Sequence, residues 1–209
     1  MKTTEKRVLR ASIKTEIYKS LQDALANPEA VENLSLCYNN LRSLPTDTGK
    51  FKNLRRLDLY YNNLRFLPEE FVNLQNLEVL NIGANPHLDL EDAFLKLAEL
   101  PRLKVLHLPA GRLKNVPAEI ILIESLKEIN LCDNDLEFFP EVLGFLNRLE
   151  NINLRGNPVQ VIPDAIRQMK SLKEVKLDYL RDSQYRNFKN MLPKCNLMIE
   201  HWAVQHELW

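Results

Sequence analysis

The sequence predicts an α/β solenoid, in which repeated units stack to form one curved parallel β-sheet along a concave face. Three observations lead to this prediction: a motif recurs along the chain, each copy contains an L-x-L alternation typical of a strand, and most copies end in Leu-Pro or a related pair. The segments after these pairs favour short helices or 3₁₀ turns, which would cover the convex face. A helical cap is expected before the first unit.

The repeated motif reads L-x-x-L-x-L-x-x-N-x-L, or a close variant, at nearly constant spacing. Copies begin at Val31, Leu54, Leu77, Leu103, Leu126, Leu149 and Leu172. Successive copies start 23 residues apart, except that the third unit is 26 residues long. The alternation of a strand sends both leucines of L-x-L to one face, and parallel strands about 4.8 Å apart would stack them into columns. Because no unit buries its own apolar face, the stack must fold together.

An asparagine follows the strand in five of the units. A short amide side chain at this place can bond backbone groups where the chain turns off the strand, and buried backbone groups need such partners. We therefore predict a structural role for this column rather than a binding role. Its members are Asn39, Asn62, Asn85, Asn134 and Asn157.

A proline-containing pair marks the start of the convex segment in most units. Proline suits the first turn of a helix, because its missing N–H has no intrahelical partner there. The pairs are Leu44-Pro45, Leu67-Pro68, Val116-Pro117, Phe139-Pro140 and Ile162-Pro163.

Two irregularities interrupt the repeat. The longer third unit lacks the Leu-Pro pair, and Asp89 there can cap a helix formed by EDAFLKLAEL. The next unit has Gly111 where asparagine is expected, so the amide column is broken at that point. These irregularities are either a tolerated insertion or the mark of a binding site.

The chain divides into three parts. Residues 1–30 form a basic tail and an N-terminal capping helix, in which Ile13, Ile17, Leu21 and Leu25 share one face and Asn27-Pro28 ends the helix. Residues 31–179 hold the seven repeats. Residues 180–209 form a C-terminal cap, predicted as a helix and a strand from 195 to 199, followed by a tail that carries two tryptophans.

These motifs resemble the leucine-rich repeat family from about Val31 to Tyr179. The Leu-Pro pairs further resemble the 23-residue class found in intracellular eukaryotic proteins of the Ras-binding group and in many bacterial proteins. The resemblance implies a module that binds a protein partner, which could be a GTPase, a kinase or a phosphatase.

Composition argues against several other functions. Lys+Arg and Asp+Glu are both 28, so the net charge is zero and a nucleic-acid binder is not expected. The three widely spaced cysteines suggest free thiols and, with no signal-peptide pattern, a cytoplasmic location. No apolar run reaches the length of a membrane span. With five glycines and no nucleophile or phosphate-loop motif, we expect no enzyme activity and no cofactor.

The residues between the strand leucines should face a partner on the concave surface. Tyrosine and arginine dominate binding hot spots, and the first units are rich in both. His107 has no histidine or cysteine beside it in the neighbouring strands, so no metal site is expected. The predicted partner-binding residues are Tyr38, Arg56, Asp58, Tyr60, Tyr61, Val79, Asn81, Val105, His107, Glu128 and Arg155.

The sequence thus predicts a monomeric, non-catalytic interaction module or adaptor that binds a protein on its concave face. Two alternatives stay open: a scaffold that self-assembles through the tail HWAVQHELW, and a bacterial effector or recognition protein. The convex segments could also supply the binding face.

Overall fold

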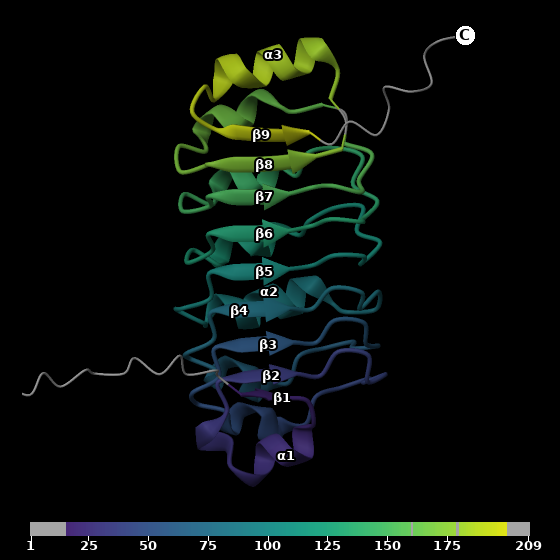
Figure 1. The fold of residues 1–209 in the computed structure, drawn as a ribbon, viewed down its shortest axis with the longest axis vertical. Helices are drawn as coiled ribbons and strands as arrows, with labels where there is room; N and C mark the ends of the chain where they lie inside the picture. The colour runs from purple at the N-terminus through teal and green to yellow at the C-terminus, as the bar shows by residue number, and fades with distance from the viewer. Residues whose placement is uncertain (1–15, 160, 179, 200–209) are drawn as a thin grey trace, which may run out of the picture.

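A single parallel sheet runs the length of the molecule. The computed structural model describes residues 16–159, 161–178 and 180–199. Within them, nine strands pair in the order of the sequence (Figure 1). The strands are β1 (Ile17–Tyr18), β2 (Asn33–Ser35), β3 (Arg56–Asp58), β4 (Val79–Asn81), β5 (Val105–His107), β6 (Glu128–Asn130), β7 (Asn151–Asn153), β8 (Glu174–Leu177) and β9 (Asn196–Ile199).

The register of the sheet places the same motif position of every unit side by side. Leu34 pairs with Leu57, Leu57 with Leu80, and this continues through Val175. Each member of this column exposes 2% of its surface or less, which confirms the predicted inner column. The column consists of Leu34, Leu57, Leu80, Leu106, Ile129, Ile152 and Val175.

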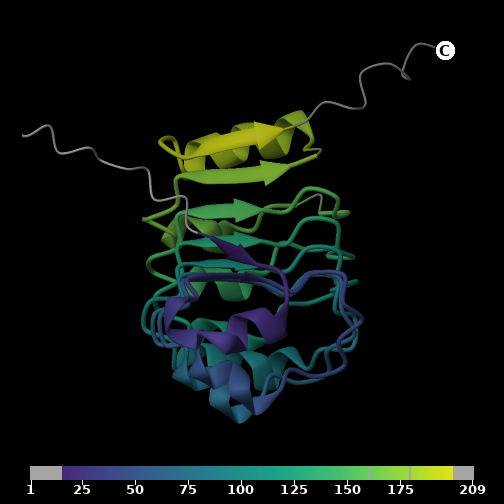
Figure 2. The same ribbon diagram turned by 60° about the horizontal axis from the view of Figure 1, so that its bottom comes forward.

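Short 3₁₀ turns form the convex side in five units, as expected, and Figure 2 shows them in a layer apart from the strands. They are η2 (Thr46–Lys50), η3 (Glu69–Asn73), η4 (Ala118–Leu122), η5 (Glu141–Phe145) and η6 (Asp164–Gln168). In each, the proline lies one residue before the turn rather than inside it. Its carbonyl accepts a hydrogen bond from the N–H of the third residue of the turn, as in the 3.0 Å bond from Phe71 N to Pro68 O. Proline therefore acts through its extended backbone and its free carbonyl.

The longer third unit carries an α-helix instead, α2 (Leu90–Ala98). Asp89 caps it as predicted, accepting a 3.1 Å hydrogen bond from Asp92 N. Lys96 joins this helix to the preceding unit: its Nζ donates to Leu67 O at 2.9 Å and forms ion pairs with Asp92 at 2.8 Å and Glu69 at 3.0 Å. Burial favours a lower pKa for Lys96, but the hydrogen bonds and charges of the two carboxylates outweigh it and raise the pKa above its usual value.

The N-terminal prediction is wrong in part. Ile17 and Tyr18 form the edge strand β1, which pairs with β2, and the helix α1 spans only Leu21–Ala26. Ser20 starts this helix by accepting a hydrogen bond from Asp23 N, and Asn27 ends it as expected. The physical reason is the open edge of β2, whose backbone groups gain partners only if the chain before α1 is extended. Ile13 lies outside the described residues.

At the other end the chain forms α3 (Asp182–Met191) and then β9, which pairs with β8. The helix and strand match the predicted order, with the strand starting one residue later, at Asn196. Trp202 and Trp209, and with them the proposed self-assembly tail, lie outside the described residues, as do residues 1–15 of the basic tail.

The asparagine column forms a ladder of amides where the strands end, and Asn62, Asn85 and Asn134 in it are buried. Asn134 is representative: its Nδ2 donates to Leu108 O and Leu131 O, both at 2.9 Å, and its Oδ1 accepts from Gly111 N at 2.8 Å and Leu113 N at 3.1 Å. The amides of Asn62, Asn85 and Asn157 reach equivalent groups in their own and the preceding unit. Each amide therefore ties two units together.

We predict that Asn134→Ala lowers the free energy of unfolding by about 3 kcal/mol, because it leaves several buried backbone groups without partners. Asn39 provides the matched control, since it is exposed at the end of the ladder and its side chain makes one bond, to Cys37 O. Asn39→Ala should cost less than about 1 kcal/mol. Urea denaturation of both variants makes the comparison, and equal losses would contradict the ladder's role.

Candidate functional site

Left-handed backbone conformations mark the ends of the strands. Tyr38, Tyr61, Ala84, Ala110 and Asp133 have φ between 51° and 58°, and Gly156 has φ 69°. Residues other than glycine, asparagine and aspartate pay about 1–2 kcal/mol for this conformation. Gly156 and Asp133 follow the conformational preference, whereas Tyr38 and Tyr61 do not. The bulky side chains in the first units are thus held at a cost in stability.

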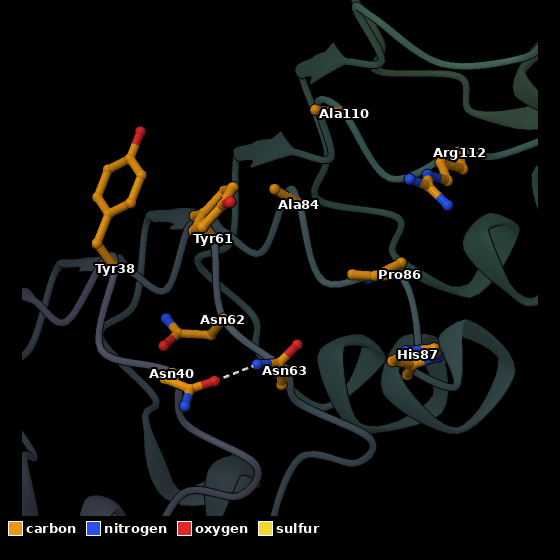
Figure 3. A pocket seen from close by; sticks show the side chains of 10 residues that line it. All are labelled: Tyr38, Asn40, Tyr61, Asn62, Asn63, Ala84, Pro86, His87, Ala110 and Arg112. Atoms are coloured by element: carbon orange, nitrogen blue, oxygen red, sulfur yellow. Dashed lines mark hydrogen bonds between the residues drawn. The ribbon is translucent and has the colours of Figure 1, made fainter.

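These strand ends enclose a hollow of about 600 Å³ beside the concave sheet, which we call the tyrosine recess. Figure 3 shows Tyr38 and Tyr61 at one end and Arg112 at the other, with Ala84 and Pro86 between them. The lining residues are Tyr38, Asn40, Tyr61, Asn62, Asn63, Ala84, Pro86, His87, Ala110 and Arg112. Of the seven described non-glycine residues with positive φ, all but Asp133 line it.

Tyr38 and Tyr61 form one wall of the tyrosine recess and belong to a cluster of three tyrosine rings. The ring of Tyr38 lies 4.9 Å from that of Tyr61 and 5.6 Å from that of Tyr60, measured between centroids. Tyr38 remains 66% exposed and Tyr61 59% exposed, so each presents a large apolar surface to solvent. The sequence-based grouping of these tyrosines therefore corresponds to a real cluster of rings.

The third and fourth units have small residues at their strand ends, where the first two units have tyrosines. A Cβ at Gly83 would lie 2.3 Å from Cδ of Pro109, so only glycine fits there. Ala84 and Ala110 continue the strand ends behind the tyrosines. The contrast between two tyrosine-bearing units and two small-residue units creates the hollow.

The far end of the tyrosine recess is positive. Arg112 is exposed with φ 58°, and within the described part of the chain its guanidinium forms no hydrogen bond or ion pair. His87 is also exposed. None of the described residues that line the tyrosine recess is acidic. The hollow therefore combines an aromatic wall with an uncompensated cation.

Tyr60 is not among the residues that line the tyrosine recess, but its ring lies beside those of Tyr38 and Tyr61. Burial raises the pKa of its phenol, and nearby Tyr38, Cys132, Asp133 and Tyr61 raise it further. The phenol thus stays protonated at neutral pH, where it can both donate and accept hydrogen bonds.

Four other predicted residues line a separate hollow of about 420 Å³ on the N-terminal part of the concave sheet: Arg56, Asp58, Val79 and Asn81. Asp58 and Asn81 have a structural role that the sequence analysis did not foresee. Asp58 Oδ1 accepts a 3.0 Å bond from Tyr60 N, and Asn81 Oδ1 accepts a 3.1 Å bond from Gly83 N. In each of these two units, one side-chain oxygen accepts a hydrogen bond from a backbone N–H just beyond the strand.

The same pattern explains His107. It occupies the motif position of Asp58 and Asn81, but the residue two places on is Pro109, which has no N–H to be held. Burial lowers the pKa of His107, while Glu128 and Asp58 act in the opposite direction. The imidazole is therefore uncharged at neutral pH.

The remaining predicted residues lie further along the concave face. Val105 pairs with Glu128 in the sheet register, and Glu128 borders a third hollow, of about 140 Å³. Arg155 is half-buried, and its N–H donates to Asn153 Oδ1 at 3.2 Å. The eleven predicted residues thus spread over several places instead of forming one site.

Five residues that form the floor and the positive end of the tyrosine recess were not predicted from the sequence: Ala84, Pro86, His87, Ala110 and Arg112. The available signal was the pair of small residues at the strand ends of the third and fourth units, Gly83-Ala84 and Pro109-Ala110. His87 and Arg112 lie in loops after the strands, where the repeat pattern constrains side-chain identity little.

Reactive groups are few in the described part of the chain. Cys37 and Cys132 are half-buried and Cys195 is buried, and all three are free thiols. Burial is the main cause that raises the pKa of Cys132 and of Cys195 to about 11. Among the described residues no group of three or more His, Cys, Asp or Glu could hold a metal ion, and none of the helices is long and apolar enough to cross a membrane.

We predict that Cys132 reacts slowly with iodoacetamide in the folded chain, because the thiolate is the nucleophile. With a pKa of about 11, its rate at pH 7.5 should be at least about 100-fold below that of the unfolded chain and should rise about tenfold per pH unit. Peptide mass spectrometry of alkylated protein at several pH values measures this. A rate that levels off by pH 9 would contradict it.

We also predict that Arg112→Asn raises the free energy of unfolding by about 1 kcal/mol, because asparagine tolerates the left-handed conformation and no side-chain hydrogen bond or ion pair with the described residues is lost. Arg148→Asn is the control: Arg148 is also exposed but has no positive φ, and its replacement should change stability by less than about 0.5 kcal/mol. Denaturant unfolding of both variants tests the prediction, which fails if Arg112→Asn is the less stable of the two.

Comparisons with known proteins find leucine-rich repeats, both by family model and among solved structures. The leucine rich repeat family model matches residues 29–86 and 101–159. A search of curated proteins found no match. Among solved structures, the chain is similar to the leucine-rich repeat protein LIC12759 of Leptospira interrogans, with 26% identity, a TM-score of 0.59, and coverage of 88% of this chain and 58% of that one.

Two further structures share the fold. One is the Toll–Spatzle complex of Drosophila, at 25% identity and TM-score 0.66, covering 78% of this chain and 22% of that one. The other is an internalin of Listeria monocytogenes, at 14% identity and TM-score 0.60, covering 87% and 59%, which shows the fold alone. The chain spans less than two thirds of each of these three proteins.

Proposed function

The chain belongs to the leucine-rich repeat family, and from this premise we propose that it is a non-catalytic module that binds a protein partner on its concave face. The fold is commonly used for protein–protein interaction, and the similar Toll structure is a complex with Spatzle. The finer expectations from the 23-residue pattern belong to this proposal: a monomeric cytoplasmic scaffold in signal transduction, with a GTPase, kinase or phosphatase as partner.

One observation carries the proposal: three tyrosine rings cluster just beyond the ends of β2 and β3, with Tyr38 and Tyr61 largely exposed. Tyrosine supplies much contact area for little lost side-chain entropy, and it is enriched among residues that dominate binding energy. The positions come from a sheet held by paired strands and buried amides, so little ordering cost is expected on binding. Arg56, on the adjoining concave surface, is exposed and adds a charged contact.

The electrostatics of three polar side chains bear on the proposal. The thiols of Cys132 and Cys195 are held protonated, and the imidazole of His107 is uncharged. The described residues that line the tyrosine recess offer aromatic rings, amides and one guanidinium. These are suited to recognition of another macromolecule.

We predict that the double substitution Tyr60→Ala/Tyr61→Ala weakens capture of the partner from a lysate of the source cell by at least about tenfold, as expected for loss of a hot spot. Quantitative mass spectrometry of the retained proteins gives the ratio between the variant and the native chain.

The matched control is Phe138→Ala/Phe145→Ala, which removes two aromatic rings that are 74% and 66% exposed away from the tyrosine cluster. The native partner should be retained by this variant. The reverse pattern, with retention by the tyrosine variant and loss from the phenylalanine variant, would move the binding site to the convex side. Thermal unfolding of both variants checks that each is folded.

A further inference from the structure

We propose that the tyrosine recess binds an extended acidic peptide segment of the partner, with a carboxylate on Arg112 and an apolar or aromatic side chain against Tyr61. This inference rests on the proposed function and names the chemistry of the segment that is recognised. It also moves the principal contact from the middle of the concave sheet to the edge where the strands end.

The positive charge of Arg112 favours an anionic group at one end of the tyrosine recess. Arg112 forms no hydrogen bond or ion pair with the described residues, and no acidic residue among them lines the hollow. A guanidinium binds a carboxylate through two parallel N–H···O bonds. Phosphate recognition in peptides relies on clusters of arginines, and only one arginine is present here. A carboxylate is therefore the better match for this site.

Apolar surface selects the second group. The face of Tyr61 and the methyl groups of Ala84 and Ala110 line the hollow together with Pro86. An aromatic ring placed there would stack against Tyr61 at a distance that offset or edge-on ring pairs prefer, and it would bury the exposed surface of the tyrosine wall. A large apolar side chain fits this half, whereas a charged one would lose its hydration without a partner.

The spacing of the repeats gives the length of the segment. Tyr61 and Arg112 belong to the second and fourth units, so about two strand spacings, or roughly 10 Å, separate their positions. An extended chain advances about 3.3 Å per residue. The apolar residue and the acidic residue of the partner should therefore be three positions apart.

The backbone of Arg112 supports a binding role. The other units have Asn40, Asn63, Pro86, Asp135, Pro158 and Arg181 at the motif position of Arg112, and of these only Asn40 also has a positive φ. The left-handed conformation is therefore not required by the repeat at this position, and arginine is an unfavourable residue for it. Strain of this kind collects at functional sites, where a side chain is retained in spite of its cost.

The experiment uses the full chain, fluorescently labelled, on an array of octapeptides. Each peptide has one Phe or Leu and one Glu in a Gly-Ser background, at separations of one to five residues, and each has a Gln-containing and a phosphoserine-containing counterpart. Binding should be strongest for Glu at a separation of three and at least about tenfold weaker for the Gln counterpart. Fluorescence anisotropy then measures Kd for the best peptide.

The variants decide the assignment. Arg112→Asn and Tyr61→Ala should each weaken the best peptide by at least about tenfold, and Arg148→Asn should leave its Kd unchanged within about twofold. Arg112→Asn should at the same time raise Tm by about 2–4 °C, which rules out unfolding as the cause of the lost binding. Preference for phosphoserine, no preferred separation, or no effect of Arg112→Asn would each overturn the proposal.

The peptide experiment and the lysate experiment together distinguish failure of the peptide-binding proposal from failure of the proposed function. If the array shows no acidic preference while Tyr60→Ala/Tyr61→Ala still releases a partner from lysate, the recess assignment is wrong and the interaction module stands. If Tyr60→Ala/Tyr61→Ala releases no partner from lysate and Arg112→Asn does not weaken peptide binding, both proposals fail.

Discussion

The turn at the end of each strand is the constraint on which this molecule depends. The chain must leave the sheet and cross to the convex side once per unit, and the crossing exposes backbone groups inside a tightly packed stack. A buried asparagine amide forms hydrogen bonds with such backbone groups in its own unit and in the preceding unit. Asn134 does so with Leu108, Leu131 and Leu113. Because each amide bonds across units, the units are stable only as a stack.

The same turn also creates the surface that can bind. A left-handed residue follows each of the strands β2 to β7, and the chain fills that position differently in successive units. The position holds tyrosine in the first two units, alanine in the next two, and then aspartate and glycine. The tyrosines form a wall of the tyrosine recess and the alanines form its floor. The candidate site therefore arises largely from variation at a position whose backbone conformation is shared between units.

The extra residues of the third unit contribute on both sides of the stack. They lengthen the convex segment into α2, which Lys96 fastens to the preceding unit. They also place His87 in the loop that borders the tyrosine recess. The irregularity that interrupts the repeat is thus adjacent to the candidate site, and Gly111, which breaks the amide ladder in the next unit, directly precedes Arg112.

Sequence alone determined the repeat, the parallel sheet, the inner leucine column and the amide ladder, because a strict period forces equivalent residues into equivalent environments. It also identified the tyrosine cluster, since Tyr38 and Tyr61 share one motif position. Tertiary structure decided the rest. Ile17 became a strand because β2 had an open edge, Asp58 and Asn81 were committed to holding backbone N–H groups, and Arg112 joined the tyrosines across two units. Such contacts depend on side-chain directions and turn conformations between units, which periodicity does not specify.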